Sequence, residues 1–597
     1  MSSFDKFIHF MSRRRHSFVS AACVILISLP VVLAQQPRKN MITPTIPTAD
    51  RTQPGKVFLE HADRLSQEEG PDNRPRDYQV LAGNVVFRKD AMFMYCDSAY
   101  FYEKTNSLDA FSNVRMEQGD TLFVYADELN YNGMTEIAHL YSGHGQQVRM
   151  VNRDVTLTTD QFQYDLKRNV GFYEFGGKLF DRQNTLTSIE GYYYPRTKDA
   201  YFIDNVKLES RNRRDTLWMF TDSLRYNTRT HIANLLCPTR IINADGEINS
   251  SSGNYNTATG RAFLFSRSTI VTKKGNVLTG DTLFYDRKSG YGEARGNMIL
   301  NDTVNKSVLY GDYGYFNEVK DSAFVTGDAL AKEYSQKDTL YLHGDTINAF
   351  RLPDSTRVTN AFRRVRFYRV DLQGLCDSMS VTERDSMLRM YDHPIVWSGE
   401  RQISGTEINV HFNDSTVDWA RLPLGGIMAE HIAEDCYNQL SGKDMTVWMN
   451  DTTVTRLYVE GNVQVIMFPM ENDSTYNKFA FVESSFMDAH FNNNQVERIL
   501  LWPETTGSVT PLYLARRSAY YLPKFRWYGT FRPLSPDEVF DNPPGMDQLL
   551  SSPDDGVGAR RMSNSVPPTR PLTPRVPEKT FTSDEIINKA TNEQENP

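Results

Sequence analysis

A short sequence motif recurs along this 597-residue chain. In each copy an acidic residue is followed by alternating polar and apolar residues and then by an aromatic one. One copy is DTLFY, from Asp281 to Tyr285. Aligned copies place an aromatic residue every 29 to 33 positions, at Phe101, Tyr131, Tyr164, Tyr194, Tyr226, Tyr255, Tyr285 and Phe316. Short strands with a fixed period of about 30 residues predict a β-solenoid or an elongated open jelly roll, in which each unit buries its apolar face by stacking on its neighbours.

A second motif lies between these lines and predicts turns. It pairs Gly with Asn or Asp, as in Gly83-Asn84, Gly296-Asn297, Gly327-Asp328 and Gly461-Asn462. Both residue types of each pair tolerate positive φ angles, so the pair suits a tight change of direction. Each unit is therefore predicted to consist of short strands joined by a turn.

The acidic position of the repeat is predicted to be structural. An ionised carboxylate buried beside Leu and Tyr would be costly, so we expect it at a bend, accepting hydrogen bonds from backbone N–H groups. Catalytic carboxylates need surroundings that separate two pKa values, whereas a residue repeated in every unit has the same surroundings throughout. The residues predicted to turn the chain are Asp97, Asp127, Asp160, Asp222, Asp281 and Asp312.

The apolar positions of the repeat are the candidate binding residues. Alternation along each strand places a Leu or Phe and the following aromatic residue on one face, which suits the interior. If the two sheets of such a stack do not close, this interior is a continuous apolar channel in which each buried methylene of a lipid chain contributes about 0.8 kcal/mol. The residues predicted to line it are Leu129, Tyr131, Phe162, Tyr164, Leu224, Tyr226, Leu283 and Tyr285.

The N-terminal segment and the charge narrow the class of protein. Three arginines, Arg13 to Arg15, precede an apolar run from Phe18 to Leu33, which is the order found in a cleaved signal peptide; an uncleaved anchor is the alternative. The whole chain carries a formal charge of −8, and its mature part, without residues 1–34, carries about −11. With no basic stripe, a nucleic-acid partner is not expected.

Known catalytic and metal-binding patterns are missing. There is no HExxH, GxSxG or P-loop, and Gly290-Tyr291-Gly292 does not continue as GxGxxG. His139 and His144 are close in sequence but have no third ligand beside them. We therefore expect no enzyme activity, no catalytic residue, no metal and no cofactor.

Four cysteines remain in the mature chain, at Cys96, Cys237, Cys376 and Cys436. Stacked strands lie roughly 4.8 Å apart, so cysteines two or more repeats apart exceed the ~7 Å Cα separation of a disulfide. Free, mostly buried thiols are expected.

The pattern A-D-x-L-x-Y followed by A-x-G-N-V resembles the OstA (organic solvent tolerance) family, which includes the lipopolysaccharide-transport protein LptA and the N-terminal domain of LptD. It is carried by Ala62 to Leu65, Ala82 to Val85, Ala126 to Tyr131 and Gly280 to Tyr285. The chain looks most like the long OstA-like proteins of Bacteroidota. The resemblance is clear over 57–350 and looser over 351–531, after a signal peptide at 1–34 and a linker at 35–56.

This resemblance implies an all-β fold, an elongated open β-jelly roll or β-taco, followed by a disordered proline-rich tail at 532–597. It also implies a periplasmic protein, either free or associated with the outer membrane, that shields the acyl chains of lipopolysaccharide in a hydrophobic groove. The implied partners are lipopolysaccharide, other jelly-roll components joined by edge-strand addition, and an outer-membrane assembly protein. The chain is longer than a typical LptA, and an outer-membrane barrel like that of LptD is not expected.

Two other hypotheses for the function of the chain remain open. A structural or adhesive surface β-solenoid would have a closed, filled interior. A parallel β-helix enzyme acting on polysaccharide would need a local acidic cluster, whereas the carboxylates here are spread one per unit.

Overall fold

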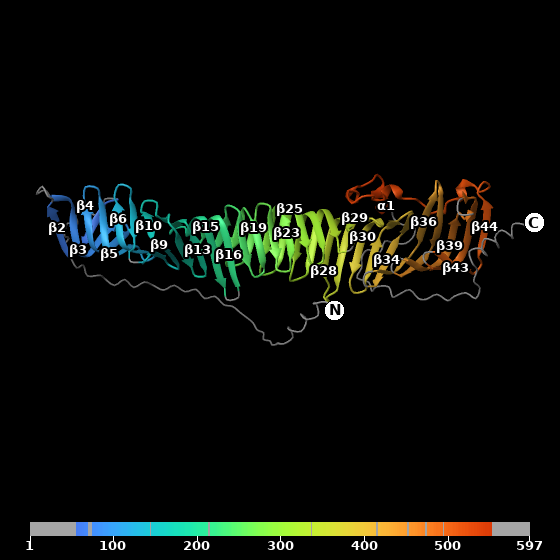
Figure 1. Cartoon of the computed structure of the whole chain (residues 1–597), viewed down its shortest axis with the longest axis horizontal. Coiled ribbons are helices and arrows are strands. Elements are labelled where there is room, and N and C mark those ends of the chain that lie inside the picture. Colours follow the sequence, from blue (N-terminus) through green and yellow to red (C-terminus); the bar gives the residue numbers. More distant parts are fainter. Residues whose placement is uncertain are drawn as a thin grey trace, which may run out of the picture. The chain divides into compact units, whose positions relative to one another are not determined.

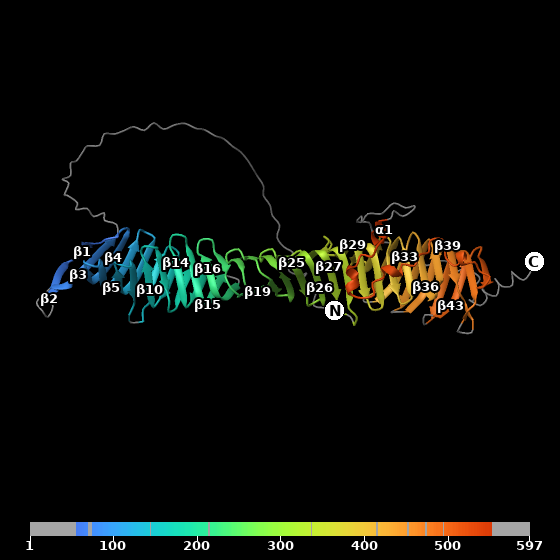
Figure 2. The same ribbon diagram turned by 90° about the horizontal axis from the view of Figure 1, so that it is seen from above.

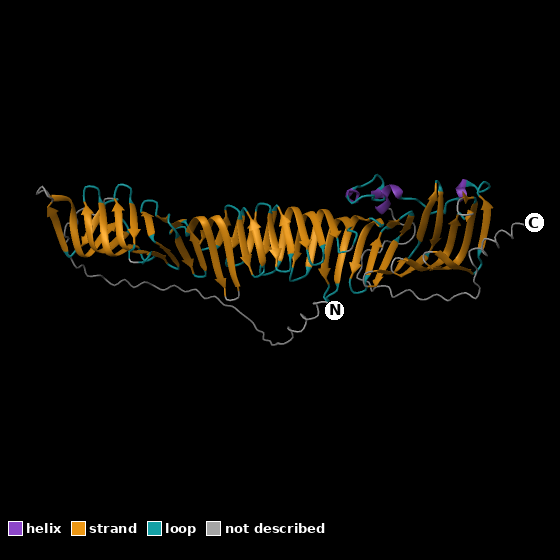
Figure 3. Cartoon of the chain, in the orientation of Figure 1, coloured by secondary structure: helices purple, strands orange, loops and turns teal. Residues whose placement is uncertain are grey.

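The computed structural model describes residues 55–69, 75–143, 145–212, 215–335, 337–413, 416–450, 453–471, 475–492 and 495–551. These residues belong to one compact unit. The expected signal peptide, the expected linker up to residue 54, and the expected tail from residue 552 onward lie outside them. Residues 532–551, which we assigned to that tail, are described and folded. Among the described residues, 42 strands form one antiparallel sheet, which confirms the all-β prediction (Figures 1 and 3).

Bends fold this sheet into two facing layers. In most of the long strands the register shifts near the middle; in β25 the shift lies between Arg295 and Met298, so one half of the strand pairs in each layer. The long strands that contribute to both layers are β3 (Pro75–Lys89), β4 (Met92–Tyr102), β5 (Ser107–Gln118), β6 (Leu122–Asn132), β15 (Asp199–Asn212), β16 (Asp215–Asn227), β25 (Tyr291–Asp302), β26 (Ser307–Asn317), β27 (Ser322–Glu333), β28 (Leu340–Arg351), β29 (Arg357–Arg369), β30 (Leu372–Thr382), β39 (Thr453–Met467) and β42 (Lys478–Asn492).

The shorter strands extend one layer each, and alternating hairpins keep both layers growing in sequence order (Figures 1 and 2). Layer 1 is extended by β2 (Arg64–Glu69), β7 (Ile137–Tyr141), β10 (Gln161–Asp165), β11 (Val170–Tyr173), β14 (Glu190–Tyr194), β17 (Ile232–Leu235), β20 (Gly253–Asn256), β21 (Arg261–Leu264), β24 (Thr282–Asp286), β31 (Met387–Tyr391), β34 (Glu407–Asn413), β35 (Thr416–Leu422), β38 (Asp444–Asn450) and β43 (Gln495–Trp502). Layer 2 is extended by β1 (Val57–His61), β8 (Val148–Asn152), β9 (Val155–Thr159), β12 (Gly177–Asp181), β13 (Asn184–Ser188), β18 (Thr239–Asn243), β19 (Gly246–Ser250), β22 (Ser268–Thr272), β23 (Asn276–Gly280), β32 (Ile395–Ser398), β33 (Arg401–Gly405), β36 (Gly426–Ala433), β37 (Cys436–Gly442) and β44 (Thr506–Pro511).

The Gly-Asn or Gly-Asp motif forms the bends of β3, β25, β27 and β39. Gly296 has φ +73° and Asn297 has φ +47°, and the three other copies of the pair have the same signs. Such angles insert an extra residue into the strand and turn it from one layer into the other. The prediction that these pairs turn the chain is confirmed.

One hydrophobic core runs between the layers, because alternate residues of each short strand, and of each half of a bent strand, point inward. The opposite parity faces outward in both layers, as in β6, where buried and more exposed residues alternate. Each fully buried Leu or Phe side chain contributes roughly 1.5–3 kcal/mol to the free energy of folding. Because these side chains are buried between the layers, the two layers stabilise each other only over the length along which they face each other.

After β44 the chain reverses and covers the outer face of layer 2. We call residues 512–551 the strap; it contains η1 (Arg517–Ala519), η2 (Gly529–Phe531), η3 (Asp537–Phe540) and α1 (Met546–Ser551) (Figure 3). A small hairpin of β40 (Met470–Glu471) and β41 (Thr475–Tyr476) precedes β42. Apolar side chains of the strap pack in two clusters on outward residues of layer 2, one of them around Trp397.

Buried glutamines of layer 2 hold the strap by its backbone. Gln439 donates to the carbonyl of Tyr520 at 2.7 Å and accepts from the N–H of Leu522 at 2.8 Å. Gln402 does the same with Arg526 and Tyr528, at 2.8 Å each. These side chains form the hydrogen bonds that the backbone of a neighbouring strand would otherwise provide, so the strap needs no β-ladder of its own.

Candidate functional site

All eight predicted binding residues lie in layer 1 and point into the interior, where each is at most 5 % exposed. They are Leu129, Tyr131, Phe162, Tyr164, Leu224, Tyr226, Leu283 and Tyr285. In this structure they are packed against one another and against layer 2. Whether they bind lipid remains a prediction, and binding there would require the layers to separate.

The aromatic rings of the interior fit because their neighbours are small. Tyr226 lies between Ala200 and Ala233 on the adjacent strands, and Tyr285 lies between Ala262 and Gly292. A large residue flanked by two small ones lets each ring lie across the neighbouring backbones without a void. Alignment of the repeat did not reveal this second set of positions.

One aligned aromatic residue was wrongly placed. Tyr194 is half-exposed and faces outward, whereas its neighbour Tyr193 is fully buried in the interior. Short alternating strands have a period of two, so an alignment that slips by one residue exchanges the two faces.

The acidic residues predicted to turn the chain lie at or beside the bends. Asp281 accepts a hydrogen bond from the side-chain amide of Asn297 at 2.7 Å and from Arg267 at 3.0 Å, and these contacts lower the pKa of its carboxyl group. Asp97 accepts in the same way from Asn113 at 2.7 Å. The partner in these copies is a side-chain amide, not the backbone N–H that we expected.

Other copies of the acidic residue have other partners. Asp127 accepts from the backbone N–H of Gly143 at 2.7 Å, and Asp160 accepts from the side chain of Gln147 at 2.9 Å. The bend therefore provides a donor that differs from one unit to the next.

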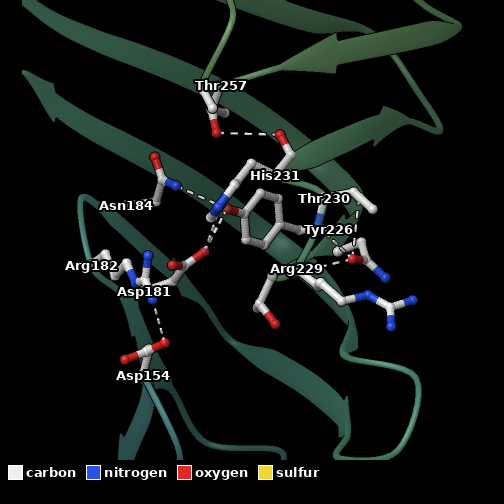
Figure 4. Close-up of polar contacts among 12 residues, drawn as sticks. Asp154, Asp181, Arg182, Asn184, Tyr226, Arg229, Thr230, His231 and Thr257 are labelled. Atoms are coloured by element: carbon white, nitrogen blue, oxygen red, sulfur yellow. Dashed lines mark hydrogen bonds and ion pairs between the residues drawn. The ribbon is translucent and has the colours of Figure 1, made fainter. Parts of the chain in front are cut away.

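Polar contacts join the layers on the side of the interior opposite the bends, which we call the mouth. The hydroxyl of Tyr226 in layer 1 donates to Asp181 in layer 2 at 2.7 Å and accepts from Asn184 at 2.8 Å (Figure 4). Nδ1 of His231 lies 3.1 Å from this hydroxyl and 3.2 Å from Asp181. Burial and the carboxylate of Asp181 raise the pKa of Tyr226, so the hydroxyl stays protonated and keeps donating.

Two further basic residues make ionic contacts across the mouth, one on either side of this cluster. Lys89 of layer 2 reaches Glu136 of layer 1 at 3.1 Å. Arg287, in a turn of layer 1, contacts both Asp215 and Asp245 of layer 2. These residues were not predicted from the sequence, because they come from turns that are far apart along the chain.

The mouth is more open farther along the chain. Many apolar residues that pack against the core are only half-buried, and all of them except Leu59, Ala62 and Leu166 lie between residues 309 and 501. Positions beside the bends remain fully covered there, as Val365 and Cys376 show. The residues of this second group include Leu309, Leu342, Leu372, Leu388, Val410, Met428, Leu440, Val465 and Ile499.

Ionic contacts also change in this part. Arg401 pairs with Glu430 at 3.0 Å within layer 2, and Arg456 pairs with Asp488 at 2.8 Å within layer 1. Such pairs stabilise neighbouring strands of one layer and leave the distance between the layers free. We call residues 307–502 the half-open section.

The remaining chemistry of the described residues is limited. No group of His, Cys, Asp and Glu among them could hold a metal ion. The four cysteines in this part are free, as expected, and burial raises the pKa of Cys96 to about 12. Within the described ranges, no helix is long and apolar enough to span a membrane.

Comparison with known protein families agrees with the repeat and the fold. Residues 54–214 and 211–281 match the model of the OstA-like protein family. The chain is OstA-like over residues 54–281. OstA-like proteins are periplasmic, lipopolysaccharide-transport-related β-jelly-roll proteins, a transport or binding family and not an enzymatic one. No curated protein matches the chain.

The structure continues the OstA-like architecture beyond the matched range. Strands β25 to β30 bend in the same way as β3 to β6, with the same shift of register at each bend. The two layers therefore extend well past residue 281, including through the whole half-open section.

Proposed function

We propose that this chain binds lipopolysaccharide in the periplasm, holding the acyl chains between its two layers and leaving the charged head group at the mouth. The observation that carries the proposal is the apolar interior that continues from β1 to β43 and becomes half-exposed between residues 309 and 501. Apolar side chains that remain half-exposed inside a fold are favourable contacts for a lipid chain, at about 0.8 kcal/mol for each methylene removed from water.

The closed part of the interior would take acyl chains only after the mouth contacts break. The half-open section would be the place where a chain enters, and Leu129 to Tyr285 would be covered or uncovered as the layers move. Because hydrogen bonds and ion pairs at the mouth contribute only about 1 kcal/mol each, a bound acyl chain can offset their loss.

The two ends of the sheet are suited to the expected jelly-roll partners. Strands β1 and β2 pair only with β3, and β43 and β44 pair only with β42, among the described residues. Each end thus offers a free edge in both layers for a second jelly roll. Bridging toward an outer-membrane assembly protein would use these edges.

Photocrosslinking tests the proposal. A photoreactive amino acid at Leu342 or Leu388 in the half-open section is expected to crosslink lipopolysaccharide in cells. The same probe at Lys332, which faces outward and lies over the rings of Tyr310 and Tyr341, serves as the control and should not crosslink.

The rival function is a structural surface repeat protein, which the filled interior of residues 57–302 favours. Absence of a crosslink at both Leu342 and Leu388, with normal expression and export of each variant, would favour that function and refute lipid binding.

A further inference from the structure

A half-enclosed cavity of about 420 Å³ lies at the mouth between β6 and β16. Layer 2 and its turns contribute one wall, which includes Asn152 and Arg153, and layer 1 contributes the other. The volume is in the range of small-molecule sites. The lining residues are Gln118, Thr121, Leu122, Asn152, Arg153, Asn169, Pro195, Arg196, Lys198 and Arg229.

The cavity gathers positive charge in a chain whose net charge is −8. Arg153, Arg196, Lys198 and Arg229 all line it. Burial, together with repulsion from Arg153 and Arg229, lowers the pKa of Lys198. Among the described residues, none of the three arginines has an ion pair, so their charges are not neutralised by the protein.

Nearby carboxylates are already engaged. Asp154 attracts Lys198 but pairs with Arg182 at 2.7 Å (Figure 4). The carboxylate of Asp165 pairs with the guanidinium of Arg168 at 3.8 Å and accepts a hydrogen bond from the backbone N–H of that residue. The cavity is therefore left with an excess of cations, which is unfavourable unless an anion enters.

The floor of the cavity connects directly to the apolar interior. Leu122 is 2 % exposed and belongs to the core. Buried tyrosine hydroxyls reach the polar floor from below: Tyr164 donates to Asn169, and Tyr193 donates to Asn152 at 3.4 Å. The side chain of Lys198 also donates to Asn152, across the two layers. An amphiphile with its acyl chain inside would thus have its head group among the four cations.

We propose that this cavity binds the phosphoryl groups of an amphiphile. The inference rests on the proposed lipid-binding function and adds the class of head group. Guanidinium groups match phosphate oxygens with paired hydrogen bonds, and four cations require more negative charge than a single carboxylate supplies. Because the cations come from both layers, a bound phosphoryl group would also hold the mouth together at this point.

The experiment compares two variants of the full mature chain. The test variant is Arg153→Gln/Arg196→Gln/Arg229→Gln, in which only exposed side chains change. The control is Arg240→Gln/Arg261→Gln/Arg267→Gln, which removes the same charge from exposed arginines that pair with Glu247, Asp286 and Asp281 outside the cavity. Binding is measured for inorganic pyrophosphate, for bisphosphorylated lipid A, and for lipid A after phosphatase treatment.

The test variant should bind both pyrophosphate and bisphosphorylated lipid A at least roughly tenfold more weakly than the wild type, while the control binds them normally. Phosphatase-treated lipid A should bind the wild type and the test variant equally. Pyrophosphate binding isolates the phosphoryl contact from the lipid contact.

Unchanged binding of pyrophosphate and lipid A by the test variant would overturn the proposal. Equal affinity of the wild type for lipid A with and without phosphates would also overturn it. If neither form of lipid A binds the wild type, the lipid-binding function fails, whereas loss of pyrophosphate binding in the test variant would still support an anion site.

Discussion

Tyr226 of layer 1 donates its hydroxyl to Asp181 of layer 2 at 2.7 Å, so a residue of the repeated line also ties the two layers together. Tyr131 occupies the equivalent place in an earlier unit, yet its buried hydroxyl has no hydrogen-bond partner among the described residues. The aromatic position of the repeat therefore links the two layers in one unit and only fills the interior in another.

Tyr226→Phe is expected to loosen the mouth. It leaves the buried carboxylate of Asp181 without its short hydrogen bond, at a cost of about 1–3 kcal/mol in the free energy of local opening. Hydrogen exchange of β12 to β17 measures this opening. Tyr131→Phe is the matched control and should be neutral or slightly stabilising; equal effects of the two substitutions would contradict the role of the Tyr226 contact.

Gly292→Ala is expected to overpack the interior. A Cβ atom on Gly292 would lie 2.4 Å from the ring of Phe316, so the ring or the strand must shift, which costs about 1–3 kcal/mol. Thermal unfolding reports the loss, and adding Phe316→Leu should recover part of it. Gly507→Ala, whose nearest atom would be 3.4 Å away, is the control; a loss there as large as at Gly292 would argue against overpacking.

Gln402→Ala is expected to release the strap. The side chain is 1 % exposed, bonds to the backbone of Arg526 and Tyr528, and accepts from the indole N–H of Trp397, so its removal leaves three polar groups without this partner. Limited proteolysis should cut residues 512–551 faster than in the wild type. Gln464→Ala, which loses only an exposed contact with Glu483, should leave the cleavage rate unchanged.

Acidification is expected to weaken the strap through His343. This residue lies beneath Phe540, with ring centroids 4.8 Å apart, and its Nδ1 lies 2.9 Å from the carbonyl of Ala329. Burial lowers the pKa of His343 below its usual 6.5, although Ala329, Asp328 and Asp345 oppose the shift and Arg364 adds to it.

Because the pKa of the folded state is depressed, the released state binds the proton more readily. Neutral His343 contributes its full stabilisation of the bound strap above pH 6.5. As the pH falls from 6.5 to the lower pKa of His343 in the folded state, this contribution is lost at up to about 1.4 kcal/mol per pH unit. Proteolysis of the strap should therefore speed up below pH 6.5. His343→Gln should remove this component; an unchanged pH dependence would assign it to other groups.

The all-β class and the position of the bends could be predicted, because the signals are local. The pair Gly296-Asn297 predicts positive φ angles at two adjacent residues, and the alternation around Leu283 and Tyr285 indicates which face of one strand points inward. Tyr194 was assigned to the wrong face because the signal is only local. In a pattern of period two, an alignment shifted by one residue exchanges the inward and outward faces.

The mouth and the strap could not be predicted, because their partners lie far apart in sequence. Asp181 and His231 are 50 residues apart, and Gln402 meets Arg526 across more than 120. Neither pair has a spacing or composition that distinguishes it from ordinary surface residues.

The sequence by itself determined that this chain stacks bent β-units with an apolar face, because propensity, alternation and turn chemistry act over a few residues. Only the tertiary structure decided where the two layers are tied and where they stay half-open. Those contacts depend on side chains from different turns meeting in space, and their energies exist only once the layers face each other.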